Sequence, residues 1–399
     1  MAVVHLTRGR QHRVAAGHPW VYGNEVESVH GHYQPGDIVD VVDHRGRFLG
    51  RGYINPASQI LVRLLTRTEE TVDEAFIRRR VREAWAYRQT VLQGSGALEP
   101  DGACRVIYSE ADGLPGLVVD RFADHLVVQS LTLGIDRWQA AVVDELDQLL
   151  APAVIYERND ASIREVEGLP LRARTLKGET GGPVHIRENG LTLLADVVHG
   201  QKTGYFLDQR ENRRVVRDIA ASLKPQRVLD AFCHVGGFAL HAAAGGAADV
   251  LALDISDEAL VMARENAGLN GLAEAIRFQN ANVFDELRRM ERDRERYDLI
   301  VLDPPAFAKS HSALEGAARG YKEINLRAMK LLPPGGYLVT CSCSFHMSPS
   351  LFREVVLDAA RDVHRELRVV EERTQAKDHP ILLGVDETHY LKCLVLQVL

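Results

Sequence analysis

The sequence predicts an α/β protein in three parts: a small β-barrel over residues 1–68, an α+β linking domain over 69–195, and a doubly wound, mostly parallel sheet over 196–399. Three observations lead to this expectation. The chain has 399 residues, which is more than one ordinary hydrophobic core accommodates. Short strand-like runs with glycine turns fill the first part. Beyond residue 210, short apolar runs alternate with helical patterns, which is typical of a parallel sheet covered on both faces.

The first part combines β-rich runs with an excess of arginine. Residues 36–42, 47–54 and 59–65 are expected to be strands of a small barrel. This part holds eight arginines and five acids, although the whole chain has a net charge of −7. The planar guanidinium donates paired hydrogen bonds to phosphates and base edges. One interpretation is therefore an RNA-binding surface, and the alternative is a solvated surface; the candidate residues are Arg8, Arg10, Arg13 and Arg51.

The second part begins with helical periodicity and continues with strands. In residues 72–92, Val72, Phe76, Val81 and Trp85 fall roughly on one helical face. Apolar runs at 104–108, 117–122 and 125–131 are expected to be strands, and they precede a helix over 135–150 and a strand over 153–157. This order is typical of an α+β domain.

The third part shows four short apolar runs, at 227–230, 249–254, 299–303 and 336–340. Asp230, Asp254 and Asp303 end three of them, and Thr340 ends the fourth. Because the carboxyl ends of parallel strands meet at one edge of a sheet, a ligand site is expected there.

Composition excludes several classes of protein. No run of eighteen apolar residues occurs, so no membrane-spanning helix is expected. The N-terminus lacks the pattern of a signal peptide, and the five cysteines are scattered and odd in number. These features favour a reducing cytoplasm with free thiols. Cys341 and Cys343 lack a second ligand pair at zinc-binding spacing, so no metal site is expected.

A glycine-containing turn after the first of these runs predicts a cofactor site. Residues 230–238 follow a strand and open a helix, where free backbone N–H groups and glycines allow close approach of a ligand. The spacing is not G-x-G-x-x-G, which makes a nicotinamide site a poor match. Asp254 is placed to accept hydrogen bonds from ribose hydroxyls. Asn282 either meets an adenine edge or caps a loop, and its spacing leaves both open.

The order Asp230, Gly236-Gly237, Asp254 and Asp303-Pro304-Pro305 resembles class I S-adenosylmethionine-dependent methyltransferases. The likeness extends along nearly the whole chain to the large-subunit ribosomal RNA cytosine-5 methyltransferase family. The runs GQKTGYFLDQR at 200–210, RGYKEIN at 319–325 and SCS at 342–344 are similar to that family, and HPWVY at 18–22 resembles the start of its PUA-type RNA-binding domain.

The resemblance implies a class I methyltransferase sheet, S-adenosylmethionine as cofactor and ribosomal RNA as partner. It also implies that Gln201, Lys202, Thr203 and Gly204 form part of the pocket floor, with Tyr205 and Asp208 near the cofactor. The sequence leaves open whether the chain forms a homodimer. Where the family commonly has an acid after the third strand, this chain has Asn282. The cofactor-binding residues are expected to be Lys202, Thr203, Tyr205, Asp208, Asp230, Phe232, Gly236, Asp254, Asn282 and Asp303.

The same resemblance assigns catalysis to Cys343 and Asp303. A thiolate that adds to carbon 6 of cytosine makes carbon 5 nucleophilic, and a carboxyl group holds the ring through N3 and the amine. Cys341 is the rival thiol, and a buried, inert cysteine is the ordinary alternative for either. Phe307 either stacks on the base or belongs to the core, and Lys309 either contacts RNA phosphate or faces water. Some related enzymes have a second cysteine where this chain has Ala306, so the base that removes the carbon 5 proton is not identified.

Three rival functions remain at this point. A purine nitrogen methyltransferase also uses an Asp-Pro-Pro motif, but it has no use for the cysteine. A non-catalytic RNA-binding protein could keep the cofactor fold, and a nicotinamide oxidoreductase lacks its glycine motif here. Replacement of Cys343 by alanine separates the first rival from the cytosine enzyme.

Overall fold

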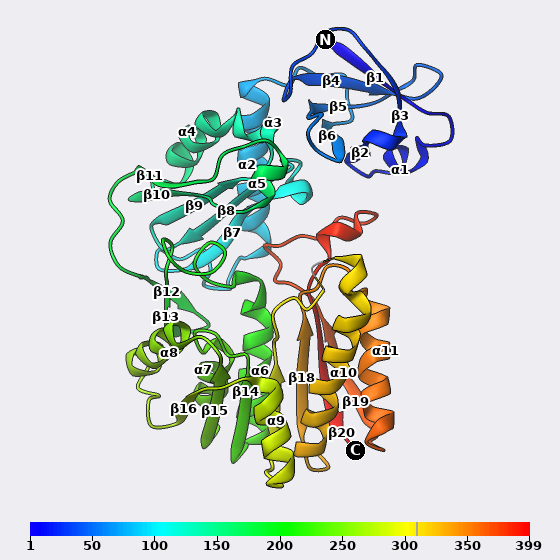
Figure 1. Cartoon of the computed structure of the whole chain (residues 1–399). Helices are drawn as coiled ribbons and strands as arrows, with labels where there is room; N and C mark the ends of the chain where they lie inside the picture. Colours follow the sequence, from blue (N-terminus) through cyan, green and yellow to red (C-terminus); the bar gives the residue numbers. More distant parts are fainter. Residues whose placement is uncertain (309) are drawn as a thin grey trace. The chain divides into compact units, whose positions relative to one another are not determined.

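The computed structural model describes residues 1–308 and 310–399 and divides the chain into two compact units (Figure 1). Unit 1 comprises Met1–Glu188, Ala195–Leu207 and Lys377–Thr388. Unit 2 comprises Asn189–Leu194, Asp208–Ala376 and His389–Leu399. The chain therefore passes between the units several times, and a segment from near its C-terminus belongs with the N-terminal residues. The three-part division at residues 68 and 195 stays a prediction.

The N-terminal domain is a curled six-stranded sheet of order β2-β6-β5-β4-β1-β3. Its core is aliphatic and includes Val4, Leu6, Val41 and Val62, because the alternate residues of each strand point to the covered face. The three predicted strands occur within one or two residues of their expected ends. The elements are β1 (Ala2–Leu6), α1 (His12–Ala15), β2 (Trp20–Tyr22), β3 (Val26–His30), β4 (Ile38–Val42), β5 (Phe48–Ile54) and β6 (Ile60–Thr66).

The middle domain, in the same unit, packs helices against a five-stranded sheet of order β11-β10-β9-β8-β7. The long helix α2 starts where Asp73 accepts a hydrogen bond from the backbone N–H of Phe76, and its buried face includes Phe76, Ile77 and Val81. The elements are α2 (Glu74–Val91), β7 (Ala103–Tyr108), β8 (Leu117–Phe122), β9 (His125–Ser130), α3 (Leu133–Asp136), α4 (Gln139–Leu150), β10 (Val154–Asn159), α5 (Ile163–Val166), β11 (Arg172–Lys177) and β12 (Val184–Glu188).

Unit 2 is built on a seven-stranded sheet of order β16-β15-β14-β17-β18-β20-β19. The first five strands in this order are parallel, and β20 runs antiparallel to both of its neighbours. The predicted runs correspond to β14, β15, β17 and β18. The strands are β13 (Leu191–Ala195), β14 (Arg227–Ala231), β15 (Asp249–Asp254), β16 (Ile276–Asn280), β17 (Leu299–Leu302), β18 (Tyr337–Ser342), β19 (Leu367–Arg373) and β20 (Lys392–Val398), with β13 at the start of the unit and outside the seven-stranded sheet.

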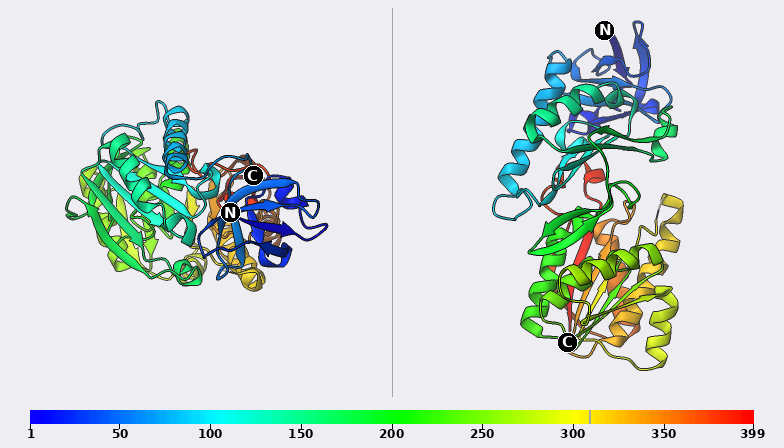
Figure 2. Two further views of the ribbon diagram at one scale, coloured as in Figure 1. Left: turned by 90° about the horizontal axis from the view of Figure 1, so that it is seen from above. Right: turned by 90° about the vertical axis from the view of Figure 1, so that its left-hand side faces the viewer.

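Helices cover both faces of this sheet, as a doubly wound fold requires (Figures 1 and 2). A large core joins one face to α9, α10 and α11 through residues such as Leu287, Ile324 and Val355. The other helices of the unit follow β13, β14 and β15. The helices are α6 (Arg210–Leu223), α7 (Gly237–Ala244), α8 (Asp257–Leu269), α9 (Val283–Arg292), α10 (Leu314–Leu331) and α11 (Pro349–Asp362).

Among the residues that the structure describes, no helix has the length and apolar character needed to cross a membrane. The same residues contain no group of three or more histidine, cysteine or acidic side chains placed to hold a metal ion.

Candidate active site

The carboxyl ends of four parallel strands place the predicted site residues at one edge of the sheet in unit 2. Asp230 lies in β14, whose register pairs it with Ala252 of β15 and Val301 of β17. Asp254 ends β15, and Asp303 follows β17 directly. Because β18 is paired in parallel with β17, the turn that carries Cys343 emerges at the same edge.

Asp230 is a buried carboxyl group with one unsatisfied oxygen. It is 0% exposed, and its Oδ2 accepts a hydrogen bond of 2.8 Å from the backbone N–H of Ala239 in α7. Oδ1 is buried without a hydrogen-bond partner in the described chain. Burial raises the pKa of Asp230 to about 8. A cationic donor such as the ammonium group of S-adenosylmethionine would satisfy this oxygen, so the residue fits the predicted cofactor.

The loop after β14 follows an unusual backbone path. Phe232 has φ 67° and His234 has φ 50°, which are left-handed values that few side chains adopt. Gly236 has φ +82° and caps α7, and a Cβ at this position would lie 3.3 Å from side-chain atoms of Ala263 and Phe278. Glycine is therefore required here both for the turn and for the close packing. Such strained loops are concentrated at ligand sites.

Asp254 is held at the end of β15 by the same loop. Its Oδ2 accepts from the backbone N–H of His234 at 2.8 Å, and its Oδ1 accepts from that of Ser256 at 2.9 Å. The carboxylate is thereby fixed in the position where ribose hydroxyls are bound in nucleotide-binding sheets, and its contact with a ribose stays a prediction.

Asn282 caps a helix. Its Oδ1 accepts hydrogen bonds from the backbone N–H groups of Phe284, at 3.0 Å, and Asp285, at 3.4 Å, at the start of α9. Of the two interpretations left open by the sequence, the structure favours the cap, because the oxygen expected to accept from an adenine amine already accepts from two backbone groups.

Asp303 is oriented by a chain of buried amides that the sequence did not point to. Gln209 donates from Nε2 to Asp303 Oδ1 at 2.9 Å, and Asn212 donates to Gln209 Oε1 at 2.6 Å. Arg373 in turn donates from Nε to Asn212 Oδ1 at 2.9 Å. Gln209 is 3% exposed and Asn212 1% exposed. Gln209 belongs to the GQKTGYFLDQR run, and its position beside Asp208 was the available signal.

The two candidate thiols lie in different environments. Cys341 is 0% exposed and pairs across the sheet with Cys393. Its pKa is raised well above the usual value by a hydrogen bond with Cys393 and by burial. Cys343 is partly exposed, and its Sγ lies 3.7 Å from the carbonyl oxygen of Pro304, the residue after Asp303. Of the two thiols, Cys343 is therefore the accessible one, and it contacts the residue that follows Asp303; Cys341 is buried, and the charge of Asp303 also raises its pKa.

The turn that carries Cys343 is anchored through Ser344. The Oγ of Ser344 accepts from the backbone N–H of Ala308 at 3.1 Å and lies 2.9 Å from the hydroxyl of Tyr321. The carbonyl oxygen of Ser344 accepts from Lys392 Nζ at 2.7 Å. No local pattern singles out Lys392, because its contact depends on how β20 pairs with β18.

The predicted cofactor residues of the 200–208 segment belong to two units. Lys202, Thr203 and Tyr205 lie in unit 1, whereas Asp208 lies in unit 2. Thr203 is buried and donates to Asp120 Oδ2 at 2.5 Å, and Asp208 accepts from the hydroxyl of Tyr390. The structure thus gives two of these residues partners within their own unit, and their contact with the cofactor stays a prediction.

The predicted RNA-binding arginines fall into two groups. Arg8 and Arg10 are exposed. Arg13 forms an ion pair of 2.7 Å with Glu25, and Arg51 forms one of 2.7 Å with Asp40. Arg8 and Arg10 therefore offer their guanidinium groups to solvent, whereas Arg13 and Arg51 also stabilise the fold of the domain through their ion pairs. Lys309, the other predicted cation, lies outside the described residues.

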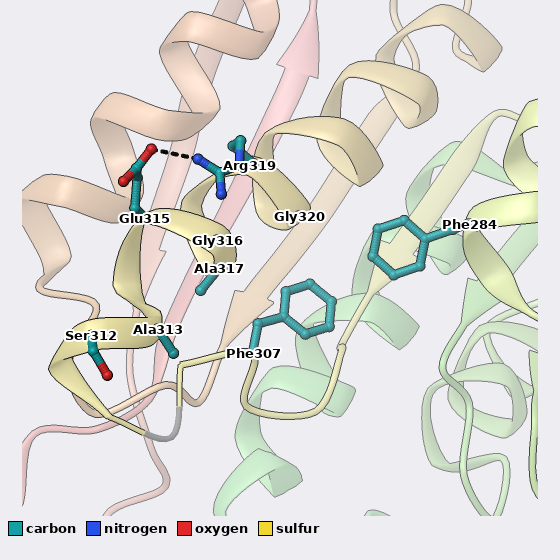
Figure 3. A pocket seen from close by; sticks show the side chains of 9 residues that line it. All are labelled: Phe284, Phe307, Ser312, Ala313, Glu315, Gly316, Ala317, Arg319 and Gly320. Carbon is teal, nitrogen blue, oxygen red and sulfur yellow. Dashed lines mark hydrogen bonds and ion pairs between the residues drawn. The ribbon is translucent and has the colours of Figure 1, made fainter.

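Phe307 lines a pocket of about 530 Å³ beside the loop that follows Asp303 (Figure 3). Its ring centroid lies 4.7 Å from that of Tyr321 and 5.8 Å from that of Phe284. Gly320 makes this approach possible, since a Cβ there would lie 3.2 Å from Phe307 Cδ2. Both interpretations of Phe307 are compatible with this position: the ring packs on the core and one side faces the pocket. The other lining residues are Ser312, Ala313, Glu315, Gly316, Ala317 and Arg319.

The chain is similar to two protein families, to solved structures and to curated proteins. Residues 4–67 match the family of PUA-like domains, and residues 165–397 match the family described as S-adenosylmethionine-dependent methyltransferase. A solved structure described as a candidate SAM-dependent methyltransferase from Streptococcus mutans covers 100% of both chains with a TM-score of 0.84 and 18% identity. A second, the methyltransferase candidate SMU.776 in complex with SAH, has a TM-score of 0.85, 18% identity and the same coverage. At this identity the two structures show the fold alone.

Curated relatives are similar over the full length. "Ribosomal RNA large subunit methyltransferase I" of Shewanella denitrificans is 44% identical over 399 residues, with 99% of each chain covered. The protein of the same name from an Enterobacter species is 40% identical over 397 residues, with 99% of this chain and 98% of that one covered. With a PUA-like domain, an S-adenosylmethionine-dependent methyltransferase domain and these relatives, the chain belongs to the ribosomal RNA large subunit methyltransferase I family.

Proposed function

We propose that this protein transfers a methyl group from S-adenosylmethionine to carbon 5 of a cytosine in large-subunit ribosomal RNA. Cys343 acts as the nucleophile and Asp303 as the group that holds the ring. The observation that supports this assignment most directly is the pair of thiol environments: Cys343 is accessible and lies 3.7 Å from the carbonyl of Pro304, whereas Cys341 is sealed in the sheet. The relatives named above act on large-subunit ribosomal RNA, as their names state.

The reaction follows from the chemistry of a weakly nucleophilic ring. The Cys343 thiolate adds to carbon 6, a new S–C bond forms, and the displaced electron pair moves toward carbon 5 and N3. The bound cofactor supplies the methyl group, which carbon 5 then takes. Loss of the carbon 5 proton returns the electron pair to the ring and expels the thiolate. Because the side chain of Ala306 cannot accept a proton, the base for this last step is a water molecule or Asp303.

Asp303 is expected to hold N3 and the exocyclic amine while charge develops on the ring. The amide of Gln209 fixes one carboxylate oxygen, so the direction in which the group faces is set before the base arrives. Preorganisation of this kind is effective because little rotation has to be frozen when the substrate binds.

The RNA is expected to contact both units. The PUA-like domain offers Arg8 and Arg10, and single-stranded RNA presents unstacked bases that aromatic side chains bind. The pocket beside Phe307 lies next to the Asp-Pro-Pro loop and is large enough for a base. We further propose that the enzyme acts in the cytoplasm. Whether it works as a monomer or as a homodimer is a separate question, which sedimentation of the purified protein answers.

Trapping with 5-fluorocytosine tests the nucleophile. Fluorine at carbon 5 cannot leave as a proton does, so the covalent adduct between enzyme and RNA persists. With RNA that carries this base and with S-adenosylmethionine, the unmodified enzyme and Cys341→Ala are expected to form the adduct, and Cys343→Ala is expected to form none.

In a parallel assay, ribosomal RNA from a strain without this protein is the substrate, and mass spectrometry locates the methyl group. Retention of most activity by Cys343→Ala would instead identify a purine nitrogen methyltransferase.

A further inference from the structure

Lys392 is a buried cation for which the fold offers no acid. It starts β20, is 4% exposed, and donates from Nζ to the carbonyl oxygens of Ser344 at 2.7 Å and Tyr390 at 2.8 Å. No carboxylate pairs with it anywhere in residues 1–308 and 310–399. Burial of an ammonium group without a carboxylate partner is unfavourable, and the two carbonyl groups offset only part of the cost of removing it from water.

The titratable group that acts on Lys392 is the thiol of Cys343. Burial lowers the pKa of Lys392 to about 8, and the charge of Cys343 opposes part of this shift. The hydroxyl of Tyr321 in α10 lies 2.9 Å from Ser344 Oγ, and its pKa is raised, chiefly by burial and to a smaller extent by the charge of Cys343. Asp303 lies one residue before Pro304, whose carbonyl contacts the thiol. The charge of Cys343 thus acts on the cation Lys392 and on Tyr321, and Lys392 is held next to the Cys343 turn by its hydrogen bond to the Ser344 carbonyl.

We infer that Lys392 is a positioning residue for the nucleophile: it holds the Cys343 turn through the Ser344 carbonyl and stabilises the Cys343 thiolate by its charge. This inference rests on the proposed function, which makes Cys343 the attacking group. A thiolate beside a cation forms at lower pH than a free thiol, so more of the nucleophile is present near neutrality. Below a pH of about 8 Lys392 carries its charge, and above that pH the assistance is lost.

Alkylation of the protein without RNA or cofactor tests this role independently of methyl transfer. Iodoacetamide reacts with thiolates, and mass spectrometry of the peptide that contains Cys343 gives its rate at each pH. In Lys392→Met the rate at pH 7 is expected to fall about tenfold, which corresponds to a thiol pKa higher by one unit. Lys392→Arg keeps the charge and is expected to retain most of the reactivity. An alkylation profile that is the same in Lys392→Met and in the unmodified protein would overturn the inference.

The controls separate folding from charge and this role from the proposed function. Lys330→Met removes a lysine of α10 that pairs with Glu291, and it is expected to leave the Cys343 profile unchanged. Thermal melting reports whether each variant is folded. If Lys392→Met does not fold, the profile of the unmodified protein decides, because an ordinary or raised thiol pKa contradicts thiolate stabilisation. If Cys343→Ala still methylates RNA, the proposed function fails whatever the alkylation shows.

Discussion

Asp230, a predicted cofactor-binding residue, has one unsatisfied carboxyl oxygen. Its Oδ1 is buried without a partner, and its pKa is raised to about 8 chiefly because burial disfavours the charged form, although the Ala239 N–H favours it. A cationic ligand group at this position would restore the charged carboxylate and lower its pKa. We therefore expect the affinity of the cofactor to be linked to the protonation of this residue.

Asp230→Asn is expected to weaken cofactor binding by roughly tenfold to a hundredfold, since an amide cannot pair with an ammonium group as a carboxylate does. The same substitution should increase the stability of the cofactor-free protein. Because the folded pKa is raised, the folded state binds a proton that the unfolded state has lost between pH 4 and about 8, so stability falls as pH rises through this window. The asparagine variant should lack this fall. Calorimetric titration and melting at several pH values measure both effects, and equal melting profiles would contradict the argument.

Gln209 is the second residue whose role follows from one contact, the 2.9 Å hydrogen bond to Asp303. Gln209→Leu is expected to lower kcat about a hundredfold with a smaller change in KM, because the misaligned carboxylate matters most when charge develops on the ring. Gln209→Glu places two acids together and raises their pKa values. Its activity should recover as pH falls, since the introduced carboxyl group can donate to Asp303 once it is protonated. A pH–rate profile checks this, and a parallel drop at every pH would indicate a purely structural role.

At the scale of elements, the loop between β14 and α7 combines strain with tight packing. Gly236→Ala forces a side chain into φ +82° and brings its Cβ to 3.3 Å from Ala263 and Phe278. We expect a loss of about 1–3 kcal/mol in the free energy of unfolding, together with weaker cofactor binding because the loop shapes the site. Gly246→Ala, at φ +100° with no atom within 4 Å of its Cβ, is the matched control for backbone strain alone. Equal losses in cofactor affinity for both variants would show that packing at position 236 is unimportant.

How much of this scale is predictable depends on whether the signal is local. The strand Asp249–Asp254 was predicted with the ends that the structure shows, because a β-branched and aliphatic run bounded by polar residues needs no distant information. The positions of Asp230, Asp254 and Asp303 at or near strand ends were predictable from the same local signals, and their roles in a site stay predictions. By contrast, the Gln209–Asp303 contact joins residues 94 positions apart, and the Lys392–Ser344 contact joins residues 48 apart. No periodicity encodes such contacts, since they depend on how the strands and α6 are placed in the finished sheet.

At the scale of the whole molecule, unit 1 joins residues that are far apart in the sequence. His18 Nε2 lies 3.0 Å from Glu387 Oε2, and Tyr53 donates its hydroxyl hydrogen to the carbonyl of Pro115 at 2.9 Å. The PUA-like sheet is therefore tied both to the middle domain and to the segment Lys377–Thr388. The arginine excess of the first 68 residues is thus presented on a firmly anchored domain, although the chain as a whole is acidic.

This distribution of charge leads to a prediction about RNA affinity. The double variant Arg8→Ala/Arg10→Ala removes two exposed cations from the PUA-like domain. If each contacts a phosphate, the slope of log K against log salt concentration should become shallower by about 1.4, because each contact with a single strand contributes about 0.7. Cofactor affinity should be unchanged, since neither arginine is among the residues expected to bind the cofactor. Arg214→Ala removes an exposed arginine that pairs with Asp218 in α6, and it serves as the control. Filter binding over a range of salt concentrations measures the slope, and an unchanged slope in the double variant would place the RNA-binding surface of this domain elsewhere.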